Sequence, residues 1–447
     1  MVNVVITGGA GFLGSRLARA LLAAGALEVA GAGARPLSRV TLVDQAPVAV
    51  PGADAGGGCY ALLLLTIRSA LSDAAHRPER SGGKGRRRGQ FAVLDRQRDT
   101  PNLQHLRASF RGTGISYPAT MRVIVTGGAG FIGTLLARRL LAGSACIGGV
   151  GPADVGELVI ADLAAPAGDV AADPRTRAVA GDLAAVIGGL GEADVIFHLA
   201  GVVSGAAEAD FDLGMRVNVD GTRAVLEHAR RHARPPVLVF SSSIAVFGTD
   251  PATGAVDVIR DDTLPRPQSS YGAQKFIAEQ LVADYSRKGF ARGRSVRLMT
   301  VSVRPGKPNA ALSGFMSGII REPLAGLRAA CPVPASTPVA LSSPRRTIDG
   351  LLRAAAVTDE AWGSRTAMTL PGLTTTPGSM AAAMDRIAGC PASDLIDWTE
   401  DPAISAIVES WPARFETPRA HALGLHPEES FDDIIRQYIA LSGPSAG

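Results

Sequence analysis

Cysteine, aromatic residues and long apolar runs are all scarce in this chain of 447 residues. The four cysteines, Cys59, Cys146, Cys331 and Cys390, stand far apart, and histidine is sparse and unclustered. These spacings exclude the common zinc-binding and dithiol motifs, so we expect reduced thiols in a cytoplasmic protein and no metal site.

Apolar runs are too short for a membrane protein. None reaches the ~18 to 20 residues that a bilayer span needs, and the longest is "CYALLLLTI" at 59–67. The N-terminus has no charged stretch before its first apolar residues, so we expect no secretory signal. A hydrophobic content of 46% is nevertheless ample for a packed globular core.

The net charge of +4 is local in origin. Residues 76–98 hold eight Lys or Arg against two Asp or Glu, which is +6, so the remainder of the chain sums to −2. A basic insert is not a basic enzyme surface, and we expect neither nucleic acid nor a membrane as partner.

The clearest feature present is an internal repeat. Residues 4–23 and 123–142 share 14 identities in 20 positions, as "VVITGGAGFLGSRLARALLA" and "VIVTGGAGFIGTLLARRLLA". Each copy is typical of a strand, a glycine-rich turn and a helix, followed by a second strand that ends in an acid, Asp44 or Asp162. The repeat stops there.

Only the second copy continues into further strand and helix patterns. We therefore predict a partial Rossmann duplicate at 1–50, a basic, disordered linker at 51–120 and an NAD-binding domain at 121–308. Residues 309–447 are expected to form mainly a smaller, mostly helical substrate-binding lobe. The predicted fold is α/β, a Rossmann-type doubly wound parallel sheet with a C-terminal lobe, preceded by the duplicated fragment.

The glycine turn of the second copy predicts a dinucleotide site. Gly127, Gly130 and Gly133 stand between a strand and a helix, where glycine permits a tight turn and lets backbone N–H groups approach a pyrophosphate. Asp162 is placed to accept the adenosine-ribose hydroxyls and would repel a 2′-phosphate. With no Arg beside it, NAD is favoured over NADP.

Two later segments add the chemistry. "SSSIAVFG" at 241–248 follows an apolar strand, and "YGAQK" at 271–275 opens a helix. Tyr271 and Lys275, four residues apart, share one helical face, so the ammonium can lower the pKa of the phenol. A serine hydroxyl from the strand end can then orient the reacting oxygen.

Together these segments, with "GDL" at 181–183, "FHLAG" at 197–201 and "NVDGT" at 218–222, resemble an extended short-chain dehydrogenase/reductase, a family also called NAD-dependent epimerase/dehydratase. The resemblance covers essentially all of 121–447. Within it, "VRPGKPN", "CPVP" and "SPRR" are most similar to the D-erythronate dehydrogenase group. The family usually has Tyr where this chain has Phe247.

The resemblance implies the site residues. Ser243, Tyr271 and Lys275 are the catalytic set, with Ser241 and Ser242 structural. The implied NAD contacts are Gly127, Gly130, Phe131, Ile132, Gly133, Asp162, Asp182, Leu183, Leu199, Ala200, Gly201, Asn218, Tyr271, Lys275 and Val303. Asn218 has one of two roles: it acts through the cofactor, which it contacts, or it holds the catalytic helix in place.

The implied reaction is oxidation of the C2 hydroxyl of a sugar acid, D-erythronate to 2-dehydro-D-erythronate. Tyr271 is the base, Lys275 lowers its pKa, and Ser243 holds the reacting oxygen. The substrate contacts are Ser204, Ser243, Tyr271, Arg304 and Asn309, with Arg304 equally open to a structural role as an ion-pair partner. The oligomeric state stays open, with a homodimer as one candidate.

Alternatives remain. A nucleotide-sugar epimerase or dehydratase shares the fold, cofactor and triad, and a non-catalytic NAD-binding redox sensor is a third reading. The leading copy could be an extra edge unit, a competitor for the slot of 122–162, a loosely attached segment, or a relic of duplication or an overextended start. Because 122–162 joins the sheet directly, we expect the cofactor there, with Gly8, Gly11, Gly14 and Asp44 as a vestigial copy.

Overall fold

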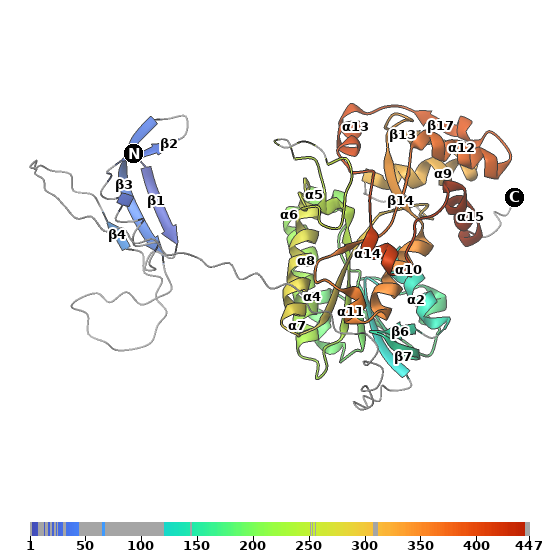
Figure 1. The fold of residues 1–447 in the computed structure, drawn as a ribbon, viewed down its shortest axis with the longest axis horizontal. Helices are drawn as coiled ribbons and strands as arrows, with labels where there is room; N and C mark the ends of the chain where they lie inside the picture. The colour runs from blue at the N-terminus through green and yellow to red at the C-terminus, as the bar shows by residue number, and fades with distance from the viewer. Residues whose placement is uncertain are drawn as a thin grey trace, which may run out of the picture. The chain divides into compact units, whose positions relative to one another are not determined.

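The computed structural model describes residues 2–7, 13, 17, 20–21, 24, 26–29, 33–43, 65–67, 120–143, 145–250, 252, 254, 256–306 and 312–442. The chain divides into two compact units, Met1–Ser109 and Phe110–Gly447, and each is treated by itself (Figure 1).

A large twisted sheet forms the centre of the second unit. Its strands run in the order β15-β11-β10-β9-β5-β7, and both β6 and β8 pair with β7. Their bounds are β5 (Thr120–Thr126), β6 (Ala145–Ile147), β7 (Val150–Asp162), β8 (Thr176–Ala180), β9 (Val195–His198), β10 (Val237–Ser243), β11 (Arg292–Leu298) and β15 (Met368–Thr369). All these pairs are parallel except β6 with β7. The strand order reverses between β5 and β9, which confirms the predicted doubly wound Rossmann-type sheet.

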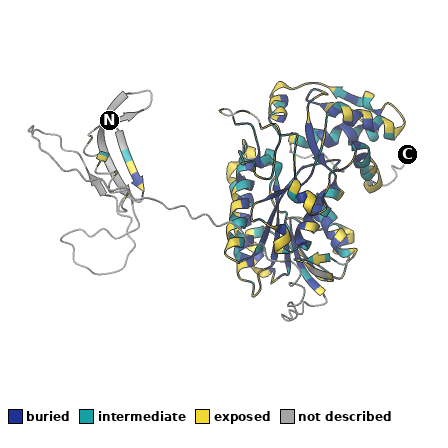
Figure 2. Ribbon diagram, viewed as in Figure 1, coloured by how far each residue is buried: buried dark blue, intermediate teal, exposed yellow. Residues whose placement is uncertain are grey.

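Helices cover both faces because side chains alternate along each strand. On β5, Val123 and Val125 pack into one apolar cluster with α2 (Phe131–Leu141), α3 (Gly168–Ala171) and α10 (Pro344–Ala356). Ile124 points the other way, into a cluster with α4 (Leu183–Val186), α7 (Gly221–Arg230) and α8 (Ser270–Arg287). Figure 2 shows the resulting buried centre of the unit. Two short helices, α5 (Ser204–Ala209) and α6 (Phe211–Gly214), follow β9.

A third apolar cluster organises the C-terminal lobe. The lobe contains a three-stranded sheet of β12 (Thr300–Val301), β14 (Val339–Ser342) and β16 (Leu373–Thr375), and a pair formed by β13 (Ala329–Cys331) and β17 (Ile396–Trp398). Its helices are α9 (Phe315–Leu324), α12 (Pro377–Ala388), α13 (Pro402–Glu409) and α15 (Phe431–Ser442).

The chain after residue 308 does not stay within that lobe. The segment 344–370, with α10, α11 (Asp359–Trp362) and β15, returns to the large sheet, and α14 (Pro418–Ala422) packs against β15. The physical reason is that α10 buries Ile348 and Leu351 in the sheet cluster, while Met368 of β15 pairs with Val296 of β11. The predicted boundary at 308/309 therefore separates the two cores only in part.

In the first unit, β1 (Val2–Thr7) pairs in parallel with β3 (Gly33–Val43), and β2 (Ala26–Val29) and β4 (Leu65–Ile67) pair with β3 in antiparallel. Thr7 pairs with Val43 as Thr126 pairs with Ala161, so the repeat extends to strand register. Except for β4 and Thr120, the predicted linker lies outside the described residues, as do Gly8, Gly11, Gly14 and Asp44.

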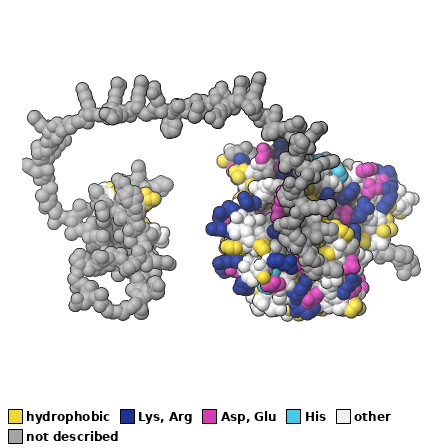
Figure 3. Space-filling view, turned by 60° about the horizontal axis from the view of Figure 1, so that its bottom comes forward, with side chains coloured by type: hydrophobic (Ala, Val, Ile, Leu, Met, Phe, Trp, Pro, Cys, Tyr) yellow, Lys and Arg dark blue, Asp and Glu magenta, His cyan; other side chains and the backbone are white. Residues whose placement is uncertain are grey.

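Charged side chains of both signs are mixed over the visible face of the second unit (Figure 3). Among the described residues, no helix combines the length and apolar character needed to cross a bilayer. Cys146, Cys331 and Cys390 are free thiols.

Candidate active site

The carboxyl ends of the central strands meet at one edge of the sheet. Thr126 of β5 is level with Ala161 of β7 and His198 of β9, and His198 is level with Phe240 of β10. The segments that directly follow these strands are therefore brought together at the switch point, where doubly wound sheets bind ligands.

The glycine turn after β5 is packed too closely for larger residues. Gly127 has φ of +70°, and a Cβ placed on it would lie 2.6 Å from the backbone N of Ala200. A Cβ on Gly133 would lie 2.5 Å from the Cα of Gly128. Glycine is thus required by the backbone at both positions, and the turn lies directly against the Leu199–Ala200 segment beyond β9.

The turn leads into an open helix N-terminus. Gly130 is the N-cap of α2 without a side-chain cap, and its first turn, which includes Phe131 and Ile132, contains no acidic residue. Free N–H groups at such an end favour an anion. This part of the site therefore fits the pyrophosphate of a dinucleotide.

Asp162 stands beside this turn at the end of β7. Its carboxylate accepts hydrogen bonds from the N–H groups of Ala129, at 3.0 Å, and Ala164, at 3.2 Å. The Gly181 N–H donates to the Asp162 carbonyl at 2.9 Å, which brings Asp182 and Leu183 next to it. Asp182 also caps α4 through the Ala184 N–H. An oriented carboxylate beside a glycine turn fits the ribose of NAD.

Asn218 connects the cofactor side to the catalytic helix. It lies in a π-helical turn, η2 (Met215–Asp220), and its side-chain oxygen accepts the Val202 N–H at 2.9 Å. Its amide donates to Gln274 of α8 at 2.8 Å. A Cβ on Gly201 would lie 2.9 Å from the Asn218 oxygen and 3.4 Å from the Lys275 Nζ. The predicted residues Gly201, Asn218 and Lys275 are therefore neighbours.

Sequence reasoning missed His198, which is fully buried between two threonines. Its Nδ1 lies 2.7 Å from the Thr126 hydroxyl and its Nε2 3.0 Å from the Thr222 hydroxyl. Burial, aided by the Lys275 charge, lowers the pKa of His198 to about 3, so the ring is neutral. A histidine within the apolar strand pattern "VIFHLA" was the available signal.

The three predicted catalytic residues converge. The Lys275 ammonium donates to the Ser241 carbonyl at 2.9 Å and lies 5.7 Å from the centre of the Tyr271 ring. Tyr271 hydrogen-bonds with Ser243, at the end of β10. Ser241 itself donates to the His198 carbonyl and Ser242 to Glu279, as expected for structural serines.

Burial dominates the electrostatics of the pair. It lowers the pKa of Lys275 to about 8, against a smaller opposing effect of Glu279. Burial also raises the pKa of Tyr271, while the Ser243 hydrogen bond and the Arg304 charge lower it. The surroundings of Tyr271 thus supply two groups that favour a phenolate.

The predicted substrate residues are placed unevenly. Arg304 is part-buried near Tyr271, and its guanidinium has a weak contact of 3.4 Å with the Ser313 hydroxyl. Ser204 begins α5 beyond β9. Val303 is fully buried in the core of the lobe, which leaves only its main chain for a nicotinamide contact. Asn309 lies outside the described residues.

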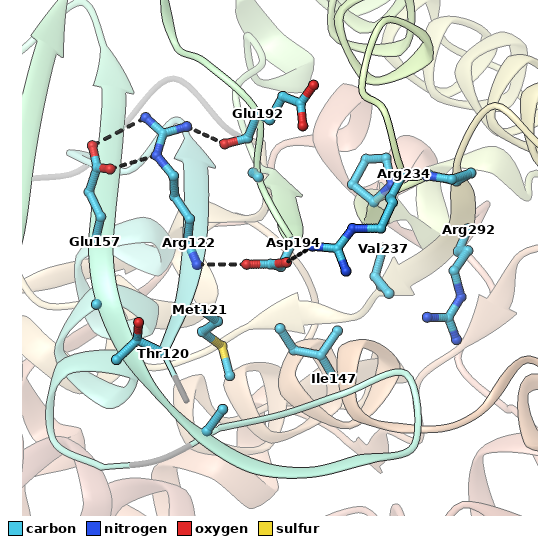
Figure 4. A pocket seen from close by; sticks show the side chains of 15 residues that line it. Thr120, Met121, Arg122, Ile147, Glu157, Glu192, Asp194, Arg234, Val237 and Arg292 are labelled. Carbon is cyan, nitrogen blue, oxygen red and sulfur yellow. Dashed lines mark hydrogen bonds and ion pairs between the residues drawn. The ribbon is translucent and has the colours of Figure 1, made fainter. Parts of the chain in front are cut away.

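A cavity of about 470 Å³ lies at the opposite edge of the sheet, around the amino ends of the strands (Figure 4). Arg122 pairs there with Glu157 at 2.6 Å and its N–H donates to Asp194 at 2.9 Å. Arg234 lies 4.0 Å from Asp194. Charges of opposite sign face one another in this cavity, and none of the predicted site residues lines it.

Comparison with known proteins agrees with the geometry. The pattern of the NAD dependent epimerase/dehydratase family matches residues 123–337. A D-erythronate dehydrogenase from Cupriavidus necator is 47% identical over 328 residues, which cover 72% of this chain and 99% of that protein. A D-erythronate dehydrogenase from Haemophilus influenzae is 38% identical over 323 residues, covering 71% and 99% respectively.

A solved structure described as a nucleoside-diphosphate-sugar epimerase, from Agrobacterium tumefaciens, is also similar. It aligns with a TM-score of 0.66 at 39% identity, covering 75% of this chain and 99% of that one. The chain is thus similar to proteins of two named activities.

Proposed function

The chain belongs to the NAD-dependent epimerase/dehydratase family, and we propose that it oxidises the C2 hydroxyl of a sugar acid, D-erythronate, to 2-dehydro-D-erythronate. It is an NAD-dependent oxidoreductase. The identity to two D-erythronate dehydrogenases, over nearly their full lengths, supports the choice of substrate.

The observation that carries the sugar-acid assignment is the position of Arg304. Its charge acts on Tyr271, and its neighbour Arg321 pairs with Glu322 at 2.5 Å. Within the described residues, no carboxylate pairs with Arg304. A part-buried guanidinium beside the catalytic phenol is suited to a substrate carboxylate, and it sets that carboxylate next to the carbon that is oxidised.

The proton is handled by Tyr271. As a phenolate it accepts the C2 hydroxyl proton, while Ser243 donates a hydrogen bond to the same oxygen as it becomes a carbonyl oxygen. Bound NAD would supply the acceptor for the hydride that leaves C2. The products are the 2-oxo acid, NADH and one proton. Lys275 favours the phenolate by its charge, and its own position is held by the Ser241 carbonyl.

We place NAD at the second copy of the repeat. The support is that Gly127, Asp162, Gly201 and Lys275 form one continuous edge. Gly130, Phe131, Ile132 and Gly133 would hold the pyrophosphate, and Asp182 and Leu183 would flank the adenine.

A nucleotide-sugar epimerase is the second candidate, because the Agrobacterium tumefaciens structure carries that description at 39% identity. The two activities separate in one assay. The full chain is incubated with NAD and D-erythronate, and separately with NAD and UDP-sugars, and NADH absorbance is followed. NADH formed with D-erythronate supports the proposal; turnover of a UDP-sugar without any NADH from D-erythronate refutes it.

A homodimer is the assembly we propose, in the cytoplasm. Phe211 on α6 is 59% exposed and Ile277 on α8 is 41% exposed, and α6 packs against α8. Two large apolar side chains on neighbouring helices support a contact with a second copy. Light scattering that gives the mass of a single chain at micromolar concentration would contradict the dimer.

A further inference from the structure

A buried ion pair lies about one helical turn beyond Lys275. Glu279 of α8 is 2% exposed and Arg297 of β11 is 5% exposed. The Arg297 Nε donates to one carboxylate oxygen at 2.8 Å and its Nη2 to the other at 2.7 Å. Ser242 of β10 adds a third hydrogen bond at 2.5 Å. One carboxylate therefore ties a helix to two strands.

The same helix and strand carry the catalytic residues. Glu279 stands four residues after Lys275, which stands four residues after Tyr271, so all three lie along one side of α8. Ser242 precedes Ser243, and Arg297 is level with Ser242 in the sheet. The ion pair thus holds α8 to β10 and β11 about two helical turns along α8 from Tyr271.

The charge of the Glu279 carboxylate also acts on the Lys275 ammonium. The groups that face its ammonium are Tyr271 and Glu279 from α8, neutral His198 from β9 and the Phe240 ring of β10, at 4.8 Å. Arg297 of β11 binds Glu279, and the Arg304 charge acts on Tyr271. Glu279 raises the pKa of Lys275 against the effect of burial.

We propose that Glu279 and Arg297 are positioning residues for the reaction. Their ion pair fixes the catalytic helix against the end of β10, and the Glu279 carboxylate maintains a negative charge beside the Lys275 ammonium. The proposal rests on the assigned Tyr271–Lys275 chemistry, but its physical content, the charge state of Lys275, is independent of which substrate is oxidised.

Glu279→Gln separates this role from simple packing. The amide keeps the size of the side chain but removes its charge, and Arg297 is left as an uncompensated cation toward Lys275. We expect the pKa of Lys275 to fall by about one unit, a tenfold change in its proton equilibrium. Lys275 then loses its charge at lower pH, and the high-pH limb of the kcat profile shifts to lower pH by the same amount.

The chain has four lysines, Lys84, Lys275, Lys288 and Lys307, which makes the test direct. In the full chain, lysine enriched in ¹³C at Cε is titrated by NMR without cofactor, with Lys275→Arg to assign its signal. The matched control is Asp359→Asn, which weakens another ion pair of β11, with Arg294 at 2.8 Å, away from Lys275. The proposal requires a downward shift in Glu279→Gln and none in Asp359→Asn.

An equal titration of Lys275 in Glu279→Gln and the unaltered chain overturns the proposal, as does an equal shift in the control. If Glu279→Gln does not fold, Glu279→Asp decides. It keeps the charge but withdraws the carboxylate by one methylene, so kcat should fall about tenfold with KM and the pH limb retained; unchanged kcat overturns the positioning role. Absence of NADH from D-erythronate in the unaltered chain would refute the substrate assignment and leave the NMR result standing.

Discussion

At the scale of residues, the site depends on two ionisable groups in a buried setting. Burial opposes charge on both Tyr271 and Lys275, while Ser243 and Arg304 favour the phenolate. A tyrosine base acts only when it is ionised. The pH dependence of the oxidation rate should therefore report the combined titration of Tyr271 and Lys275.

Lys275→Met tests that coupling. If the Lys275 charge favours the Tyr271 phenolate as proposed, its removal raises the pKa of Tyr271, and the low-pH limb of kcat/KM moves upward by about one pH unit or more. The measurement is the pH profile of NADH formation. Lys288→Met, at the exposed end of the same helix, is the control and should retain the original profile. A Lys275→Met profile that coincides with the original contradicts the coupling.

Arg304→Gln tests the carboxylate contact. Loss of one charge-assisted pair should raise KM for D-erythronate about 100-fold, with a smaller effect on kcat. Steady-state rates with D-erythronate and with an uncharged four-carbon polyol separate the carboxylate from the rest of the substrate. Arg328→Gln breaks an exposed pair with Asp397 and should change neither. If both substrates lose equally in Arg304→Gln, Arg304 has a structural role.

At the scale of elements, the repeated strand–turn–helix unit offers a matched pair of glycines. Gly8 and Gly127 occupy the same position of the two copies, in "TGGAGFLG" and "TGGAGFIG". The φ of +70° at Gly127, and the 2.6 Å that would separate a Cβ from Ala200, make alanine there both strained and obstructed.

Gly127→Ala should therefore lower the affinity for NAD about 100-fold or more, because the backbone must shift at the pyrophosphate turn. Gly8→Ala should leave the affinity unchanged if the cofactor binds at the second copy. Calorimetric titration of the full chain with NAD measures both. Loss of affinity in Gly8→Ala alone would assign the cofactor to the first copy.

Elements with a strong local signature were predictable from the sequence. The glycine turn, the strand that ends at Asp162 and the alternation of strands and helices follow from periodicity and motif order, because each is specified by contiguous residues. The triad was reached through family resemblance, and its members are found together.

Features that depend on distant contacts were not predictable. The return of 344–370 to the large sheet depends on the pairing of Met368 with Val296. No local sequence pattern predicts that pairing. Likewise, Glu279 and Arg297 read as ordinary charged positions of a helix and a strand, and only the fold brings them together in the interior.

At the scale of the whole molecule, the two units share the repeated sequence at their first strand but differ in how that strand is paired and buried. Val5 is 64% exposed and Leu17 is 51% exposed, whereas their counterparts Ile124 and Leu136 are fully buried. In the second unit β5 pairs with both β7 and β9, while the pairs described for β1 are with β3 alone. The enzyme chemistry is therefore assigned to the second unit.

The most direct test of that assignment is NADH formation by the full chain with NAD and D-erythronate, compared between the unaltered protein and Tyr271→Phe. The account predicts NADH from the unaltered protein and a rate lower by about 100-fold or more in Tyr271→Phe, with NAD affinity retained. An unchanged rate in Tyr271→Phe would contradict it.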